Sequence, residues 1–178
     1  MIPASPLDGA ILALDLAENA GWALWVPADH PMIFAHGTEH FAGHSFARRF
    51  SKCHSFVSGM VARHKICTVL IEKPFHRGEA ATRAGWGFAG VAEAAASAAG
   101  AARSLLINVQ TPKRVLTGRG HASKEEMIAT ITALGFTPGT DHEADAIGLL
   151  LAYMEDPTCA KATSGAIKRS PRKGRAKK

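Results

Sequence analysis

Two apolar runs that each end on a carboxylate constrain the fold of this chain more than any other feature of its sequence. Residues 10–16 read AILALDL and residues 68–75 read TVLIEKPF. Apolar runs of this length, bounded by turn residues, are typical of strands buried on both faces of a sheet. A buried carboxylate without a partner is costly. Glu72 is therefore either the first solvated residue after a core strand or a residue that holds a charged partner, and this segment alone leaves both open.

The order of the other segments predicts an α/β protein. Strands are expected at 10–16, 21–26, about 32–37, 68–72 and 104–110, and the first three should form an antiparallel meander. Helices are expected at 45–64, 78–100, 123–134 and 141–154, the third opened by a capping box of Ser123 and Glu126. The predicted architecture is a five-stranded mixed sheet flanked by helices, with the first, fourth and fifth strands side by side.

Charge divides the chain into a near-neutral body and a basic end. The chain has 178 residues and a formal net charge of +6, and residues 161–178 contain eight Lys or Arg and no acid. We expect one folded domain at 8–156 and a disordered basic tail at 157–178, because the tail has too few apolar residues for a core. The tail serves either solubility or the binding of a polyanion, for which nucleic acid is the obvious partner.

Cysteine usage and the N-terminal segment favour a cytoplasmic protein. The three cysteines are far apart in sequence and form no C-x-x-C pair, so neither a disulfide framework nor a zinc site is expected. The first 16 residues lack a basic region, and their short apolar run ends at Asp15. They therefore match neither a signal peptide nor a membrane span, and no membrane partner is expected.

Three acids occupy otherwise apolar elements. Asp15 ends the first strand, Glu72 ends the fourth, and Asp145 lies in the first turns of an apolar helix. Two carboxylates about 5 Å apart repel by about 3 kcal/mol at an effective dielectric constant near 20, so a cation must offset the charge. Few basic residues lie within these elements. A divalent ion with oxygen ligands, Mg²⁺ or Mn²⁺, is the economical partner.

His142 lies three residues before Asp145, which places both on one face of a helix. Next to a metal site, His142 is a candidate ligand or proton shuttle, although an isolated helical histidine is more often a surface or capping residue. Asp141 and Glu143 compete for the same role. Asp141 could instead be the N-cap of the helix, and Glu143 could favour the positive helix N-terminus from solvent.

These segments resemble the RuvC-type Holliday junction resolvases of the RNase H-like superfamily. The matching stretches occur in order along residues 10–154, and they are ILALDLAENAGWAL, VLIEKPF, PKRVLTGRGHASKEEM and HEADAIGLLLAY. The resemblance implies an RNase H-like fold and a nuclease. It also implies that Asp15, Glu72, His142 and Asp145 bind two Mg²⁺ or Mn²⁺ ions and form the catalytic set, with no small-molecule cofactor.

The resemblance also assigns nucleic-acid contacts to the segments around this set. Lys113 and Lys124 match basic residues that contact DNA or stabilise the scissile phosphate, so Lys124 joins the catalytic residues. Phe75 matches an aromatic that wedges against bases at the junction, although it could also be a packing residue after Pro74. Gly118 and Gly120 would let a loop approach the phosphate backbone closely, with Arg119 nearby.

The expected function is cleavage of a four-way junction or other branched DNA by a homodimer, which gives paired symmetric nicks. The basic tail and the compact form favour a bacteriophage version. One alternative keeps the fold but changes the substrate to forks, flaps or RNA/DNA hybrids. Others are a non-catalytic DNA-binding module of the same fold and a helix-rich partner-binding protein whose acids are all solvated.

Overall fold

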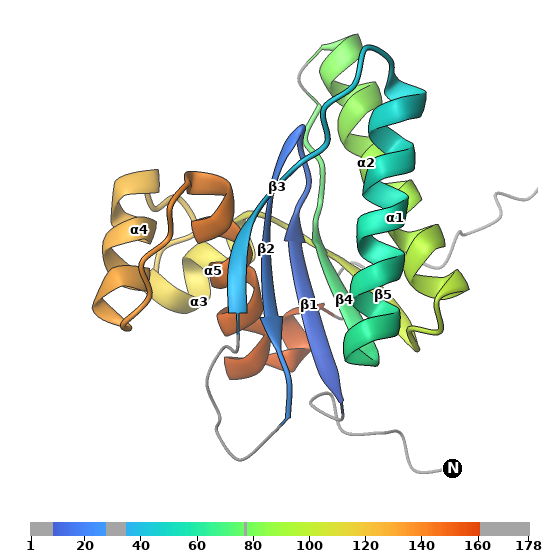
Figure 1. Cartoon of the computed structure of the whole chain (residues 1–178). Helices are drawn as coiled ribbons and strands as arrows, with labels where there is room; N and C mark the ends of the chain where they lie inside the picture. Colours follow the sequence, from blue (N-terminus) through green and yellow to red (C-terminus); the bar gives the residue numbers. More distant parts are fainter. Residues whose placement is uncertain (1–8, 28–34, 77, 161–178) are drawn as a thin grey trace, which may run out of the picture.

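A mixed sheet with helices on both of its faces organises the described part of the chain (Figure 1). The computed structural model describes residues 9–27, 35–76 and 78–160. The strands are β1 (Ala10–Asp15), β2 (Asn19–Trp25), β3 (Ala35–His40), β4 (Ile66–Glu72) and β5 (Arg103–Ile107). The helices are α1 (Phe46–His64), α2 (Glu79–Ala98), α3 (Gln110–Thr117), α4 (Lys124–Ala133), α5 (Asp141–Glu155) and the short 3₁₀ helix η1 (Pro157–Ala160).

The strand order is β3-β2-β1-β4-β5. β1 and β2 pair antiparallel, as do β2 and β3, whereas β4 runs parallel to both β1 and β5. The sequence prediction of a meander followed by two parallel strands is therefore confirmed. Parallel pairing matters for the site, because it brings the carboxyl ends of β1 and β4 to the same edge of the sheet.

Alternating side chains of β1 enter two separate cores. Leu12 and Leu14 belong to the core that α1 and α2 cover, and Ile11 and Ala13 belong to the core that α5 covers. All four are at most 1% exposed. A strand buried on both faces needs a continuous apolar run rather than an alternating one, which explains the AILAL sequence.

Helix ends follow local capping chemistry. Ser45 caps α1, and Lys65 ends it in the left-handed conformation at φ 52°. At α4 the predicted capping box is confirmed, because the Ser123 side chain accepts from the Glu126 N–H while the Glu126 side chain accepts from the Ser123 N–H. Among the described residues, no helix has the length and apolar character that a membrane span requires.

Several boundaries differ from the sequence predictions, and the largest differences lie at the third strand and after the fifth. The third strand is Ala35–His40 rather than 32–37, of which residues 32–34 lie outside the described part. β5 ends at Ile107, and residues 110–117 form α3 where a continued strand and a loop were predicted. The side chain of Asn108 accepts from the Gln110 N–H, and Pro112 suits a first helical turn, so the strand gives way to a helix.

The end of the predicted domain is partly described. Residues 157–160 form η1, and Cys159 packs against the core beside α5. Residues 161–178 lie outside the described residues, so the predicted basic tail and the domain boundaries stay predictions.

Gly21 on β2 allows the N-terminus of α5 to reach the sheet. A Cβ atom built at Gly21 would lie 1.9 Å from the His142 carbonyl oxygen and 2.6 Å from the Glu143 nitrogen. Both contacts are with backbone, so no rotamer change could relieve them. Gly21 also pairs with Asp15 in the β1–β2 ladder. The absence of a side chain on β2 therefore sets how closely α5 approaches the end of β1.

We predict that Gly21→Ala lowers the free energy of unfolding by about 3 kcal/mol or more, because the backbone of α5 must move away from β2. Gly59→Ala in α1 is the matched control, since a Cβ at Gly59 meets nothing within 4 Å. The control should gain up to about 1 kcal/mol from helix propensity. Urea unfolding of both variants measures the difference, and equal stability of Gly21→Ala and the wild type would contradict the argument.

Candidate active site

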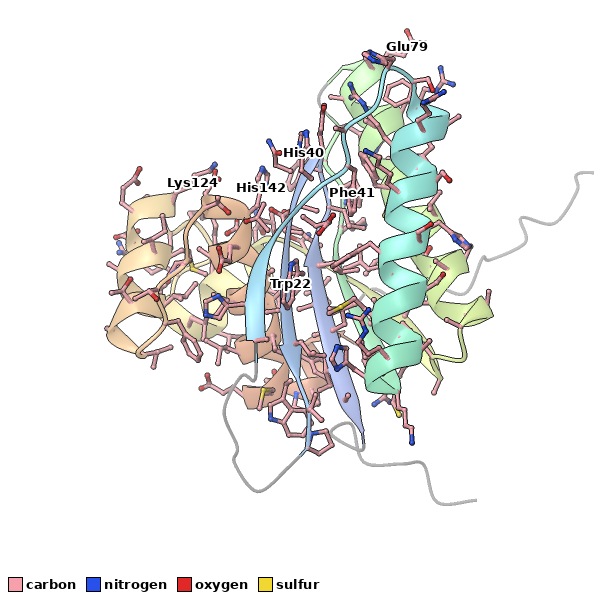
Figure 2. All side chains as sticks on the ribbon, in the orientation of Figure 1. Trp22, His40, Phe41, Glu79, Lys124 and His142 are labelled. Carbon is pink, nitrogen blue, oxygen red and sulfur yellow. The ribbon has the colours of Figure 1, made fainter. Side chains whose placement is uncertain are left out.

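The candidate active site is an open pocket at the carboxyl ends of β1 and β4, where the N-terminal turns of α5 meet the sheet. Its volume is about 420 Å³. It is lined by all four residues of the predicted catalytic set, Asp15, Glu72, His142 and Asp145. Figure 2 shows His142 near the end of the sheet, with Lys124 on the neighbouring helix α4. The fold therefore gathers side chains that are up to 130 positions apart in sequence.

Asp15 and His142 are joined directly. The His142 Nδ1 atom lies 2.5 Å from the Asp15 Oδ2 atom, and their side chains are 35% and 14% exposed. The hydrogen bond to the Asp15 carboxylate raises the pKa of His142, and burial opposes that shift. This contact connects the first strand to the final helix.

Asp145 lies one helical turn beyond His142, and its pKa is strongly shifted. Burial first, and then the negative charge of Asp15, raise its pKa from 3.8 to about 6. The positive charges of Lys113 and Lys124 act in the opposite direction. Carboxyl groups with strongly shifted pKa values in a pocket are typical of functional sites, because the fold holds them together in spite of the hydration that they lose.

Lys124 extends over the pocket from the first turn of α4. It is ion-paired with Asp141, and the two side chains are 63% and 41% exposed. The Lys124 ammonium lowers the pKa of Asp141. The alternative in which Asp141 caps α5 is wrong, because Thr140 is the N-cap and its hydroxyl accepts from the Glu143 N–H.

Glu143 is buried rather than solvated, so the predicted solvent role for this residue is also wrong. Its side chain accepts a hydrogen bond from the Gly139 N–H at 2.9 Å and pairs with His36 of β3. The residue is only 7% exposed. Glu143 therefore attaches α5 to the outer strand of the sheet and does not line the pocket.

The residues predicted to contact DNA are only partly gathered at this pocket. Lys113 lines the pocket, but its ammonium donates to the Ala122 carbonyl at 2.7 Å, which connects α3 to the segment before α4. Arg119 pairs with Glu126, and Gly118 ends α3 in the left-handed conformation at φ 74°. The lining of the pocket includes none of Gly118, Arg119 and Gly120.

The segment after β4 forms another wall of the pocket. Lys73, Pro74 and Phe75 all line it, and Phe75 is 55% exposed. Phe75 is a site residue predicted from the sequence, whereas Lys73 is not among the predicted residues. The signal for Lys73 was its position directly after Glu72, at the end of a buried strand.

The carboxylate and imidazole groups of the pocket are ligands that a hard divalent cation can use, but they are not arranged as a metal site. Three carboxylates and an imidazole line one pocket, and burial, followed by the charge of Asp15, raises the pKa of Asp145. Among the described residues, however, no three His, Cys, Asp or Glu side chains are gathered closely enough to hold an ion as they stand. The Asp15–His142 hydrogen bond is the contact that a cation would replace.

Comparison with solved structures places the chain in a known fold class, the RNase H-like α/β fold of RuvC. The Thermus thermophilus RuvC structure aligns with a TM-score of 0.69 and 22% identity over 84% of this chain and 97% of that chain. The structure of T. thermophilus RuvC in complex with a Holliday junction substrate aligns with a TM-score of 0.69 and 22% identity. The alignment covers 82% of this chain and 93% of that chain.

A more distant resolvase shares the same architecture. The yeast mitochondrial Holliday junction resolvase Ydc2 gives a TM-score of 0.61 and 11% identity over 85% of this chain and 80% of that chain. No model of a known protein family matches the sequence, and neither does any curated protein. The RuvC-type resemblance and the RNase H-like fold predicted from the sequence are thus confirmed at the level of architecture.

We predict that Asp145→Asn stabilises the protein at high pH when divalent ions are absent. The folded pKa of about 6 exceeds the ordinary value of 3.8, so the wild type loses stability as pH rises from about 4 to 6 and keeps that penalty above it. The variant should be more stable by about 2 kcal/mol at pH 8, and the advantage should disappear below pH 4.

Thermal and urea unfolding in EDTA across this pH range measure the effect. Glu155→Gln, an exposed change at the other end of α5, is the matched control and should show no such pH-dependent gain. An advantage of Asp145→Asn that grew toward low pH would contradict the assignment.

Proposed function

We propose that this protein is a metal-dependent endonuclease that cuts Holliday junctions or other branched DNA. The observation that carries the proposal is the single pocket lined by Asp15, Glu72, His142 and Asp145 in a chain with the RuvC fold. Ydc2 is a Holliday junction resolvase, and RuvC has been solved in complex with a Holliday junction substrate. The positive charge of Lys113 and Lys124 at the pocket favours a phosphate-bearing ligand.

The four residues of the catalytic set would hold the metal, with two ions per site. Bound divalent ions would activate water and neutralise charge on the attacked phosphate and on the leaving oxygen. Before metal binds, the hydrogen bond with Asp15 keeps the imidazole of His142 directed into the pocket. Lys124 is exposed at the rim of the pocket. It would bind a phosphate oxygen when its ion pair with Asp141 breaks.

A four-way junction has two equivalent strands to cut, and a two-fold symmetric dimer would present two equivalent pockets to them. We therefore propose a homodimer that makes paired symmetric nicks. The cytoplasmic location, the bacteriophage origin and the identity of the ion as Mg²⁺ or Mn²⁺ are predictions that accompany this proposal.

We predict that the purified protein nicks a synthetic four-way junction in Mg²⁺, and that Asp145→Asn lowers the rate at least about 100-fold because a metal ligand is lost. Glu125→Gln, an exposed acid on α4 that does not line the pocket, is the matched control and should cut at the wild-type rate. Equal cutting by Asp145→Asn and the wild type would refute the assignment of the pocket.

The same assay, run in competition with forks, flaps and RNA/DNA hybrids, separates the junction from the other substrates considered. Preference for the junction supports the proposal in its narrow form. Equal cutting of all branched substrates reduces it to a general RNase H-like nuclease, and binding without cutting indicates a DNA-binding module.

For residues 161–178 we predict a role in affinity and not in chemistry. Truncation after Ala160 removes eight positive charges and no negative one, so fewer counterions are released on binding. The slope of log affinity against log salt should become less steep by several units, while the single-turnover cutting rate at saturation is unchanged. A tail of equal length without charge is the control, and an unchanged slope after truncation would exclude the tail from binding.

A further inference from the structure

A second pocket lies against the candidate active site and shares a wall with it. Its volume is about 310 Å³, and its lining residues are Lys73, Pro74, Phe75, His76, Trp86 and Asn108. Lys73, Pro74 and Phe75 also line the carboxylate pocket. A ligand that reached from one pocket to the other would therefore cross only the short segment that follows β4.

Aromatic rings dominate this second pocket. Phe75 is 55% exposed and Trp86 is 37% exposed, and only two other large apolar side chains of the described residues are so exposed. The Trp86 ring lies 6.4 Å from the His76 ring, between centroids. Large exposed rings are unfavourable in water, and two of them in one hollow indicate a surface that a flat apolar ligand covers.

Close packing and hydrogen bonds hold the pocket in shape. A Cβ atom at Gly85 would lie 3.0 Å from the Pro74 Cβ atom, so the glycine lets α2 pack against this segment and brings Trp86 alongside it. The Lys73 N–H donates to the Ile107 carbonyl at 2.8 Å, which ties the same segment to β5. One wall of the pocket is thus held by a backbone hydrogen bond and another by close packing of α2 against the Pro74 side chain.

Asn108 supplies a directed polar group. Its side-chain oxygen accepts from the Gln110 N–H at 3.0 Å, which orients the amide and leaves its NH₂ group to donate to a ligand. These groups match the parts of a nucleotide. The aromatic rings match a flat base, the amide matches the acceptor atoms of that base, and the lysine shared with the neighbouring pocket matches a phosphate.

We propose that this second pocket takes one unpaired nucleobase of the substrate strand whose phosphate lies in the carboxylate pocket. Trp86 stacks on the base, and the Asn108 amide donates to an acceptor on its edge. This inference rests on the proposed function and deepens it by naming a base-binding subsite beyond the wedge expected at Phe75. Branched DNA supplies unpaired bases at little cost, since its crossover is already open.

The proposal is tested with the full-length protein and a four-way junction that carries 2-aminopurine, one position at a time, around the crossover. Binding is measured in EDTA, which prevents cleavage. We expect quenching of 2-aminopurine at one position and its loss in Trp86→Ala. Junction affinity should fall about 5-fold to 100-fold in Trp86→Ala, as for one lost base stack, and much less in Trp86→Phe.

Leu134→Ala is the matched control, because Leu134 is 50% exposed and lines neither pocket. It should bind like the wild type. Asn108→Ala should alter the preference among bases at the quenched position and leave the affinity for an abasic nucleotide there unchanged. Thermal melting of each variant checks that it is folded.

The outcomes separate the inference from the proposed function. A wild-type protein that neither binds nor cuts nucleic acid refutes both. Normal junction cutting, together with unaltered binding and 2-aminopurine signal in Trp86→Ala, refutes the base subsite alone. A change of oligomeric state in Trp86→Ala, measured by light scattering, would assign the pocket to contact with a second copy of the chain and also overturn the inference.

Discussion

The close approach of α5 to β2 at Gly21 is the constraint on which the site depends. Because no side chain stands between them, the backbone at His142 reaches the sheet next to Asp15, and the Asp15–His142 hydrogen bond forms. On the other flank, Glu143 fastens the same helix to His36 of β3. The position of Asp145 follows from these two attachments, since it lies on the next turn of the helix that they hold against the sheet.

The negative charge of the pocket destabilises the folded state, and a binding partner of opposite charge would remove this destabilisation. Burial and the neighbouring Asp15 raise the pKa of Asp145, so keeping it ionised at neutral pH costs stability. Lys113 and Lys124 offset only part of this, because each is also engaged elsewhere, with Ala122 and Asp141. Sites that trade stability for function are expected to show this kind of unresolved electrostatic strain.

Much of the architecture could be predicted because its determinants are local. The apolar runs that end at Asp15 and Glu72 identify β1 and β4, and parallel pairing then brings their ends together. The three-residue spacing of His142 and Asp145 places both on one helical face. Other features depend on partners distant in sequence. The burial of Glu143 requires His36, 107 positions away, and the importance of Gly21 is visible only once α5 is packed on it.

The short segment after β4 is both the outer wall of the carboxylate pocket and the inner wall of the aromatic one. It is anchored at Lys73 to β5 and pressed by α2 at Pro74, so it has little freedom to adjust on one side alone. Under the proposed function, a base on the aromatic side would therefore affect the alignment of a phosphate on the acidic side. Selectivity in such an arrangement appears in turnover more than in equilibrium binding, because a poorly seated ligand can be held and still be misaligned for reaction.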